Sequence, residues 1–495
     1  SRYYHCFADQ KNSADYAYAF GVNEFVLCAS AYQPWIDKYP GSTAGGKHYC
    51  LNRNNTYWEY SRPFWDYQAR CSALMRKGVP VVDICVYLGQ NPPVKLVTYR
   101  LPEIPEGYDF DVCTAEALVG RTMAVDGRLT LPTGISYSLL VIQRNNDMPL
   151  HVLRHIAGLV KGGVIVCGPR PDGSDSLKDK AESEEYRALV DELWGELTTV
   201  SQIRKVGKGK IYENIPLSEV LKYENIRPDI AIKSGNTAKD KVYFVHRRLS
   251  DADVYFLNNH SDRAFHDTIR LRTDARQAEY WDAVTGQRYM IPVKASGEKG
   301  MLLNLTLAPR ESGFIVTSNN QATGLLPRIA DVQETITPIE GSWNVYFDPR
   351  WGGPGKVVFD ELIDWTVHAD TGIRYYSGTV VYHKELNLAM PAQNERLLLR
   401  FPRLGSLARV WVNGKEVVTV WCSPWEADIT SYVHEGKNNL KIEVVNSLMN
   451  RMIGDASLPE SERFTYAYPQ IATPTDKLVP SGIMEQLNLV YRQCQ

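Results

Sequence analysis

The pattern of the 495-residue chain changes near residue 233, and this change constrains the fold more than any other feature. Before it, short apolar runs alternate with segments whose apolar residues recur at helical spacing. After it, apolar runs such as 242–245, 253–257 and 268–272 follow one another with turn residues between them. The chain is therefore predicted to be a multidomain protein that combines α/β units with all-β units.

The first region, 1–105, contains one strand-loop-helix-strand unit of a parallel α/β fold. A short helix at 15–20 precedes an apolar run at 25–29, which reads as a buried strand. A second helix over 64–74 leads to another apolar run at 81–87. One such unit is too small to form a domain. The pattern predicts the last section of a (β/α)8 barrel, with its beginning upstream and one side of the layer open or covered by a partner.

The second region, 106–232, is predicted to be a small doubly wound α/β domain. Strands at 138–142 and 164–167 flank a helix, and together they form a right-handed β-α-β unit. The segment 206–210 reads Val-Gly-Lys-Gly-Lys, but it does not link a strand to a helix as a phosphate-binding loop must. A nucleotide-binding function is therefore not predicted.

The remaining regions, 233–322 and 323–495, are predicted to be a β-sandwich and a second all-β domain. In the second of them, Asn413-Gly414 separates apolar runs at 409–412 and 416–420. This dipeptide favours the left-handed backbone of a two-residue hairpin turn. We therefore expect a β-hairpin at this position.

Charge and cysteine usage exclude several classes of function. The net charge of −2 gives no electrostatic basis for binding nucleic acid or acidic membranes. No apolar run approaches the ~20 residues of a membrane span. The nine cysteines form no CxxC pair, so no zinc site is predicted.

The long loop between the two strands of the first region has the composition of a sugar-binding site. In a parallel barrel, loops at the carboxyl ends of strands hold the substrate. Aromatic rings cover the C–H face of a sugar, while amides and guanidinium groups bind its hydroxyls. A structural loop packed on its own aromatic residues is the alternative, and both readings stay open. The candidate binding residues, including one at the end of the second strand, are Tyr32, Gln33, Trp35, Arg53, Trp58 and Tyr87.

Several separated motifs carry a resemblance to a known family. The first region resembles the late barrel section of the α-L-rhamnosidases of glycoside hydrolase family 106. The residues that carry this likeness are Asp15-Tyr-Ala-Tyr-Ala-Phe-Gly-Val-Asn23, Gln33-Pro34-Trp35, Pro40-Gly41, Arg53, Thr56, Trp58 and Asp83.

The later regions extend the resemblance. The second region is similar to the flavodoxin-type, amidotransferase-like α/β domain that such enzymes carry after the barrel, and without a Cys–His nucleophile it is expected to be structural. The fourth region resembles the galactose-binding-like jelly roll of β-galactosidase-type enzymes, through Val410-Trp-Val-Asn-Gly414 and Gly436-Lys-Asn-Asn-Leu440. Asn446, Asn450, Arg451 and Asp455 extend this likeness towards family 106. Such modules bind sugar in some proteins and only support the barrel in others.

The resemblance implies an enzyme that hydrolyses α-L-rhamnosides of plant or microbial polysaccharides, with inversion and two carboxyl groups. The family's catalytic glutamates would fall upstream of Ser1, so the upstream part of the enzyme is an implied partner. Within the chain, Glu59 and Asp83 are weaker candidates, and Asp15 is interpreted as structural. Calcium is compatible with the resemblance, but no acidic cluster specifies it.

The sequence departs from the family at two positions of the loop, where Cys28 and Tyr32 replace histidines. Loss of an imidazole removes a possible proton carrier. A non-catalytic carbohydrate-binding or scaffold remnant of such an enzyme therefore stays open as the alternative. The resemblance also implies a secreted or periplasmic protein, although the printed sequence contains no leader.

Overall fold

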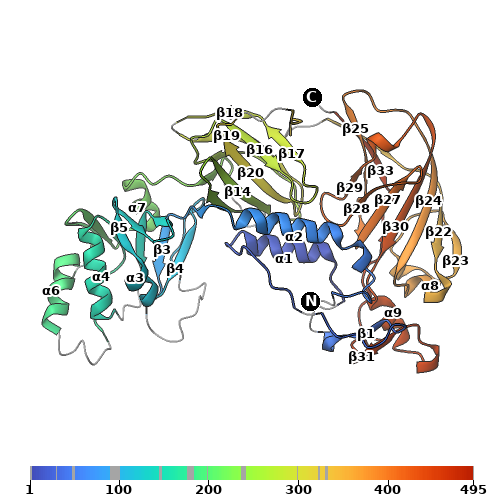
Figure 1. Cartoon of the computed structure of the whole chain (residues 1–495), viewed down its shortest axis with the longest axis horizontal. Coiled ribbons are helices and arrows are strands. Elements are labelled where there is room, and N and C mark those ends of the chain that lie inside the picture. The colour runs from blue at the N-terminus through green and yellow to red at the C-terminus, as the bar shows by residue number, and fades with distance from the viewer. Residues whose placement is uncertain are drawn as a thin grey trace.

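The computed structural model shows three bodies in a row, and two helices run from the central body towards the one that contains the C-terminal part of the chain (Figure 1). An α/β unit stands at one end and a β-sandwich in the middle. At the other end stands a C-terminal domain of two antiparallel sheets, which keeps the name of the expected jelly roll below. The structure describes residues 3–28, 30–46, 51–89, 101–143, 148–174, 183–197, 199–235, 241–297, 299–320, 324–328 and 333–493.

Helices α1 (Phe7–Tyr18) and α2 (Arg62–Met75) join the sandwich to the jelly roll. Their buried side chains share one core with Phe256 of the sandwich and Trp421 of the jelly roll. The helix predicted over 64–74 is confirmed, whereas α1 begins eight residues before the predicted start at 15. The buried positions of α2 follow the helical spacing, and they are Phe64, Tyr67, Cys71 and Met75.

The prediction of a buried strand at 25–29 is wrong. Residues 22–28 have no regular structure, Val26 is 97% exposed, and Ala29 lies outside the described residues. An apolar run becomes a buried parallel strand only where neighbouring strands pair with it. No strand of the described chain pairs with this segment.

The α/β unit is a six-stranded sheet with helices on both faces. The strand order is β10 (Gln202–Val206), β11 (Gly209–Glu213), β9 (Ile165–Cys167), β8 (Leu139–Ile142), β3 (Ile84–Tyr87) and β4 (Phe110–Cys113). All neighbouring strands are parallel except the β10–β11 pair. The helices are α3 (Ala115–Arg121), α4 (Leu150–Lys161), α6 (Ser183–Trp194) and α7 (Leu217–Tyr223). Cys85 and Tyr87 face a core formed with α3, α4 and α6, whereas Ile84 and Val86 face α7.

Strand β3 corrects the predicted division of the chain. The strand at 81–87 exists, but it lies inside the doubly wound sheet, where Ile84 aligns with both Phe110 and Leu139. A buried barrel strand and a buried strand of an open parallel sheet share the same apolar pattern, so the sequence alone did not separate them. The α/β unit therefore begins near residue 81 and not near 105, and the described part of 1–105 forms no parallel barrel layer.

The β-sandwich encloses one apolar core between two sheets. The first is β12 (Ile230–Ile232), β15 (Phe265–Leu271), β19 (Met301–Leu307) and β18 (Val293–Ala295). The second is β17 (Arg288–Ile291), β16 (Gln277–Trp281), β20 (Ser312–Ser318), β14 (Ala252–Asn259), β13 (Val242–Arg248) and β2 (Val79–Pro80). The predicted sandwich is thus present, with β2 added at its edge.

Gly78 allows the end of α2 to approach strand β13 closely. Its φ is +61°, and a Cβ at this position would lie 2.2 Å from the carbonyl oxygen of Arg248. Only glycine adopts this backbone without strain and leaves that space open. The chain therefore passes directly from α2 into β2 and then into the α/β unit.

The jelly roll consists of two antiparallel sheets around a second large core. The larger one is β23 (Gly355–Phe359), β22 (Trp343–Phe347), β24 (Thr379–Leu388), β30 (Gly436–Val445), β27 (Leu407–Val412) and β28 (Lys415–Val420). The smaller one is β21 (Glu334–Pro338), β33 (Asn488–Gln493), β25 (Glu395–Arg400) and β29 (Glu426–Asp428). The predicted hairpin is confirmed, because Asn413 and Gly414 have φ values of 52° and 78° between β27 and β28.

Candidate functional site

The loop predicted to bind sugar is called the 30–60 loop, and its described residues are 30–46 and 51–60. It is bound to a C-terminal segment that follows the buried helix α9 (Met449–Asp455). Strand β1 (Pro40–Ser42) of the loop pairs in parallel with β31 (Tyr466–Tyr468). The side-chain amide of Gln33 binds both backbone groups of Ser42 in β1. Its Nε2 donates to the Ser42 carbonyl at 2.7 Å, and its Oε1 accepts from the Ser42 N–H at 2.8 Å. Gln33 therefore holds the loop and is itself buried.

Arg53 and Trp35 fix the same part of the loop. The Nη2 atom of Arg53 donates to the carbonyls of Gln33 and Trp35, at 3.1 and 3.2 Å. The Trp35 ring meets the Tyr466 ring edge to face, with 5.0 Å between centroids, and the Lys38 ammonium lies 4.0 Å from the Tyr466 centroid. Three of the predicted residues are thus brought together, in contacts that order the loop.

Two further predicted residues are exposed on this loop. Tyr32 is 83% exposed, and Trp58 is 41% exposed on the short helix η2 (Trp58–Tyr60). The base of η2 is fixed by Thr56, whose hydroxyl donates to the carbonyl of Asn446 at 2.6 Å. The prediction for Tyr87 is wrong: it is 2% exposed and packs in the core under α4, because β3 belongs to the α/β unit.

Neither weak carboxylate candidate has the surroundings of a glycosidase acid. The carbonyl of Glu59 accepts from Nη2 of Arg409 at 3.1 Å, and its side chain is on the surface. Asp83 is buried, and its two oxygens accept from Arg272 at 3.1 and 2.8 Å, with Ser138 Oγ donating at 3.0 Å. Asp83 is therefore committed to a structural ion pair.

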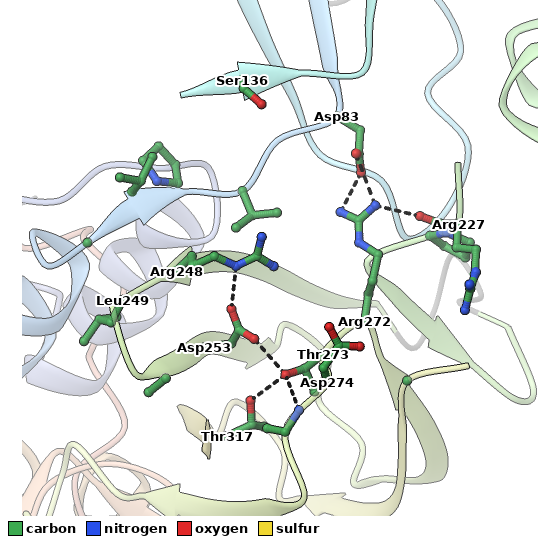
Figure 2. A pocket seen from close by; sticks show the side chains of 18 of the residues that line it. Asp83, Ser136, Arg227, Arg248, Leu249, Asp253, Arg272, Thr273, Asp274 and Thr317 are labelled. Carbon is green, nitrogen blue, oxygen red and sulfur yellow. Dashed lines mark hydrogen bonds and ion pairs between the residues drawn. The ribbon is translucent and has the colours of Figure 1, made fainter. Parts of the chain in front are cut away.

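A large cleft lies between the α/β unit and the β-sandwich (Figure 2). Its volume is about 1340 Å³. One wall carries Asp83, Ser136 and Arg128, the latter two on β7 (Ser136–Tyr137) and β6 (Arg128–Thr130). The opposite wall belongs to strands β13 to β15 and the end of β20.

A buried charge network forms one side of this cleft. Arg272 donates to Asp83 and also to Asp229, at 3.2 Å from Nε to Oδ1. His246 lies between two carboxylates, with Nδ1 2.9 Å from Asp229 and Nε2 3.0 Å from Asp253. Arg248 Nε donates to Asp253 at 3.0 Å. Three carboxylates thus face two guanidinium groups, and the network is neutral only when His246 is protonated.

The surroundings of His246 determine its protonation. Burial disfavours the imidazolium, but the hydrogen bonds and negative charges of Asp229 and Asp253 outweigh burial and raise the pKa of His246. The pKa of Asp253 is shifted downwards. Burial raises this pKa, but the hydrogen bond from His246 and the positive charge of His246 outweigh burial and lower it to about 2.

We expect the free energy of unfolding to fall as the pH rises above about 6.5. The folded pKa of His246 is raised above its unfolded value. The contribution of protonated His246 to the free energy of unfolding is therefore complete below its unfolded pKa. This contribution is lost as the pH rises through the folded pKa of His246. Denaturant titrations between about pH 6 and pH 9 measure this slope. His246→Gln should flatten it, and His151→Gln, on the exposed face of α4, should not; equal slopes in all three proteins would contradict the assignment.

The sequence did not reveal this network. Its members come from five separate segments, and each one lies in an ordinary strand or loop pattern. Of the network's residues, only Asp83 is singled out by the sequence, as a weak candidate for a catalytic carboxylate. The fold of the sandwich brings four of these segments together. Its packing on the α/β unit adds the fifth, which carries Asp83.

Among the residues that the structure describes, no group of three or more His, Cys, Asp or Glu side chains is placed to hold a metal ion. Within the same residues, no helix is long and apolar enough to cross a membrane. Calcium therefore stays an untested implication of the family resemblance.

Comparison with known proteins gives consistent matches along the chain. The model of glycoside hydrolase family 106, described as alpha-L-rhamnosidase, matches residues 1–294. The model of the glycosyl hydrolase family 2 sugar binding domain matches residues 330–491, which contain the jelly roll.

Two relatives are similar over most of the chain. The rhamnosidase from Novosphingobium sp. PP1Y superposes with a TM-score of 0.89 at 28% identity, over 99% of this chain and 46% of its own. A protein of Formosa agariphila, provisionally named a beta-glucuronidase, is 22% identical over 91% of this chain and 57% of its own length. The chain thus spans about half the length of these relatives. Because the family model covers more than half of the 495 residues, the chain belongs to glycoside hydrolase family 106, the alpha-L-rhamnosidase family.

Proposed function

We propose that this chain is the C-terminal part of an enzyme that hydrolyses α-L-rhamnosides of plant or microbial polysaccharides. The observation that carries this proposal is the family 106 match, which runs through the 30–60 loop and into the sandwich. The superposition on a rhamnosidase over 99% of the chain supports it. A secreted or periplasmic location is proposed on the same resemblance.

The proposed mechanism is inverting, with one carboxylic acid that protonates the leaving oxygen and one carboxylate that activates water. We place both groups in an upstream part of the enzyme. Two observations support this placement: Asp83 is held by Arg272 and Ser138, and the relatives are about twice as long as this chain.

The 30–60 loop is proposed to form one wall of the sugar site. Its base is fixed by Gln33, Arg53 and Thr56, so the exposed rings of Tyr32 and Trp58 are presented from an ordered segment. Preorganised rings lose little freedom when a sugar binds. Rhamnose also carries a methyl group in place of a hydroxymethyl group, and an aromatic ring suits such an apolar edge.

Removal of these rings should weaken substrate binding more than it slows the chemical step. In the enzyme with its upstream part, we expect Tyr32→Ala and Trp58→Ala to raise KM about tenfold, with kcat changed far less. Ile36→Ala removes an equally exposed apolar side chain from the same loop and serves as the matched control. Steady-state kinetics with an aryl α-L-rhamnoside measure the effect. A KM that neither aromatic variant alters would contradict the role of the loop.

A further inference from the structure

The cleft between the α/β unit and the sandwich carries an excess of positive charge. Its basic lining residues are Arg128, Arg227, Arg248, Arg270, Arg272 and Lys299, against four aspartates. Asp83 is paired with Arg272 and Asp253 with Arg248. Apart from these two pairs, four basic residues line the cleft against two aspartates, Asp251 and Asp274. None of the residues that line the described cleft is aromatic, so it offers no ring for stacking on a neutral sugar.

All described hydrogen bonds of Arg128 go to uncharged groups. Its Nε and Nη1 donate to the hydroxyls of Ser136 and Ser138, at 2.6 and 2.9 Å, and its Nη2 donates to the Ser136 carbonyl at 2.9 Å. Burial lowers the pKa of Arg128, and the nearby charges of Arg272 and Arg248 act in the same direction, against Asp83. A half-buried guanidinium beside two others is stabilised by a bound anion.

Arg248 lines the opposite wall of the same cleft, and its charge acts on Arg128. It is 57% exposed, and its described hydrogen bond to Asp253 uses only Nε. Figure 2 shows the rest of the guanidinium projecting into the space between Ser136 and Asp253. Two guanidinium groups from different domains thus border one open space, an arrangement that recognises a carboxylate through charged hydrogen bonds.

The rest of the lining favours a saccharide over a small inorganic anion. Ser250, Asn225 and Asn319 add hydroxyl and amide groups of the kind that bind sugar hydroxyls. The volume of about 1340 Å³ also exceeds that of a usual small-molecule pocket, about 300–1,000 Å³. A single phosphate or acetate would leave most of this space empty.

We propose that the interdomain cleft binds an acidic oligosaccharide, with a uronate carboxylate held between Arg128 and Arg248. No residue of the 30–60 loop lines the cleft, so this site is separate from the proposed rhamnoside site. The inference goes beyond rhamnoside hydrolysis, and it would hold even if the chain belonged to an inactive relative.

Binding is tested by calorimetry on the whole chain with trigalacturonate, with its methyl ester and with inorganic phosphate. The free acid and the ester differ mainly in charge, so we expect the ester to bind at least about tenfold more weakly. Arg128→Gln and Arg248→Gln should each weaken binding of the acid by about tenfold or more. Arg62→Gln, at an 84% exposed position on α2, should leave it unchanged.

Three outcomes would overturn the proposal: equal binding of the acid and its ester, phosphate binding as tightly as the acid, or unchanged binding in both arginine variants. Thermal melting identifies a variant that fails to fold. If Arg128→Gln does so, Arg248→Gln decides the question, because that side chain is largely exposed. Calorimetry measures binding alone, so a negative result for the acidic oligosaccharide says nothing against rhamnoside hydrolysis, and the two proposals fail separately.

Discussion

Asp15→Ala is expected to destabilise the chain by about 3–5 kcal/mol, because it leaves a buried ammonium group without its counter-charge. Lys11 Nζ lies 2.7 Å from Asp15 Oδ2, and both side chains are almost completely buried. Lys11 also donates to Ser312 Oγ of β20 at 2.8 Å, and Tyr67 of α2 donates to Asp15. The loss would therefore affect α1, α2 and the sandwich together.

Urea denaturation followed by tryptophan fluorescence measures this change, since Trp421 lies in the same core. Asp66→Ala breaks the exposed Arg62–Asp66 pair on α2 and should cost less than about 1 kcal/mol. The double change Lys11→Met with Asp15→Leu should recover much of the loss, because it removes both charges. Equal effects of Asp15→Ala and Asp66→Ala would show that the buried pair is not required.

Arg272→Met is expected to have an effect of similar size, about 3–5 kcal/mol, because Asp83 and Asp229 would lose their shared guanidinium. Asp83 belongs to the α/β unit, whereas Arg272 follows β15 of the sandwich (Figure 2). The change should therefore loosen the contact between the two bodies as well as lower their stability.

Chemical denaturation and limited proteolysis of the junction measure both consequences. Arg270→Met, at an exposed position two residues earlier, is the matched control and should change stability by less than about 0.5 kcal/mol. Asp83→Asn combined with Arg272→Met should recover part of the loss, since one buried charge is removed. A stability of Arg272→Met equal to that of the control would contradict the role of the network.

Features set by neighbouring residues were predictable from the sequence. The hairpin at Asn413-Gly414 depends on two adjacent left-handed residues, and α2 depends on apolar spacing within a single helix. Strand 81–87 was also found, but the sheet to which it belongs was not, because strand pairing is decided by distant segments. The apolar run predicted as a strand at 25–29 shows the same limit, since its composition does not reveal that no strand of the described residues pairs with it.

The site was predictable only in part. Gln33, Trp35 and Arg53 lie close together, in contacts that anchor the loop. Their role in binding a sugar stays a prediction. Tyr466, which packs on Trp35, lies more than 400 residues away in the sequence. The Asp229–His246–Asp253 group depends in the same way on tertiary packing.

The most direct test is turnover of an aryl α-L-rhamnoside by the 495-residue chain, beside the same chain extended upstream. We expect the extended enzyme to hydrolyse the substrate and the shorter chain to show no turnover above background. A general acid and a general base each contribute about 10²–10⁴-fold, and the shorter chain would lack both. Absence of turnover in the extended enzyme as well would favour the non-catalytic carbohydrate-binding alternative. Robust turnover by the shorter chain, abolished by Glu59→Gln or by a folded Asp83→Asn variant, would contradict the placement of the catalytic acids upstream.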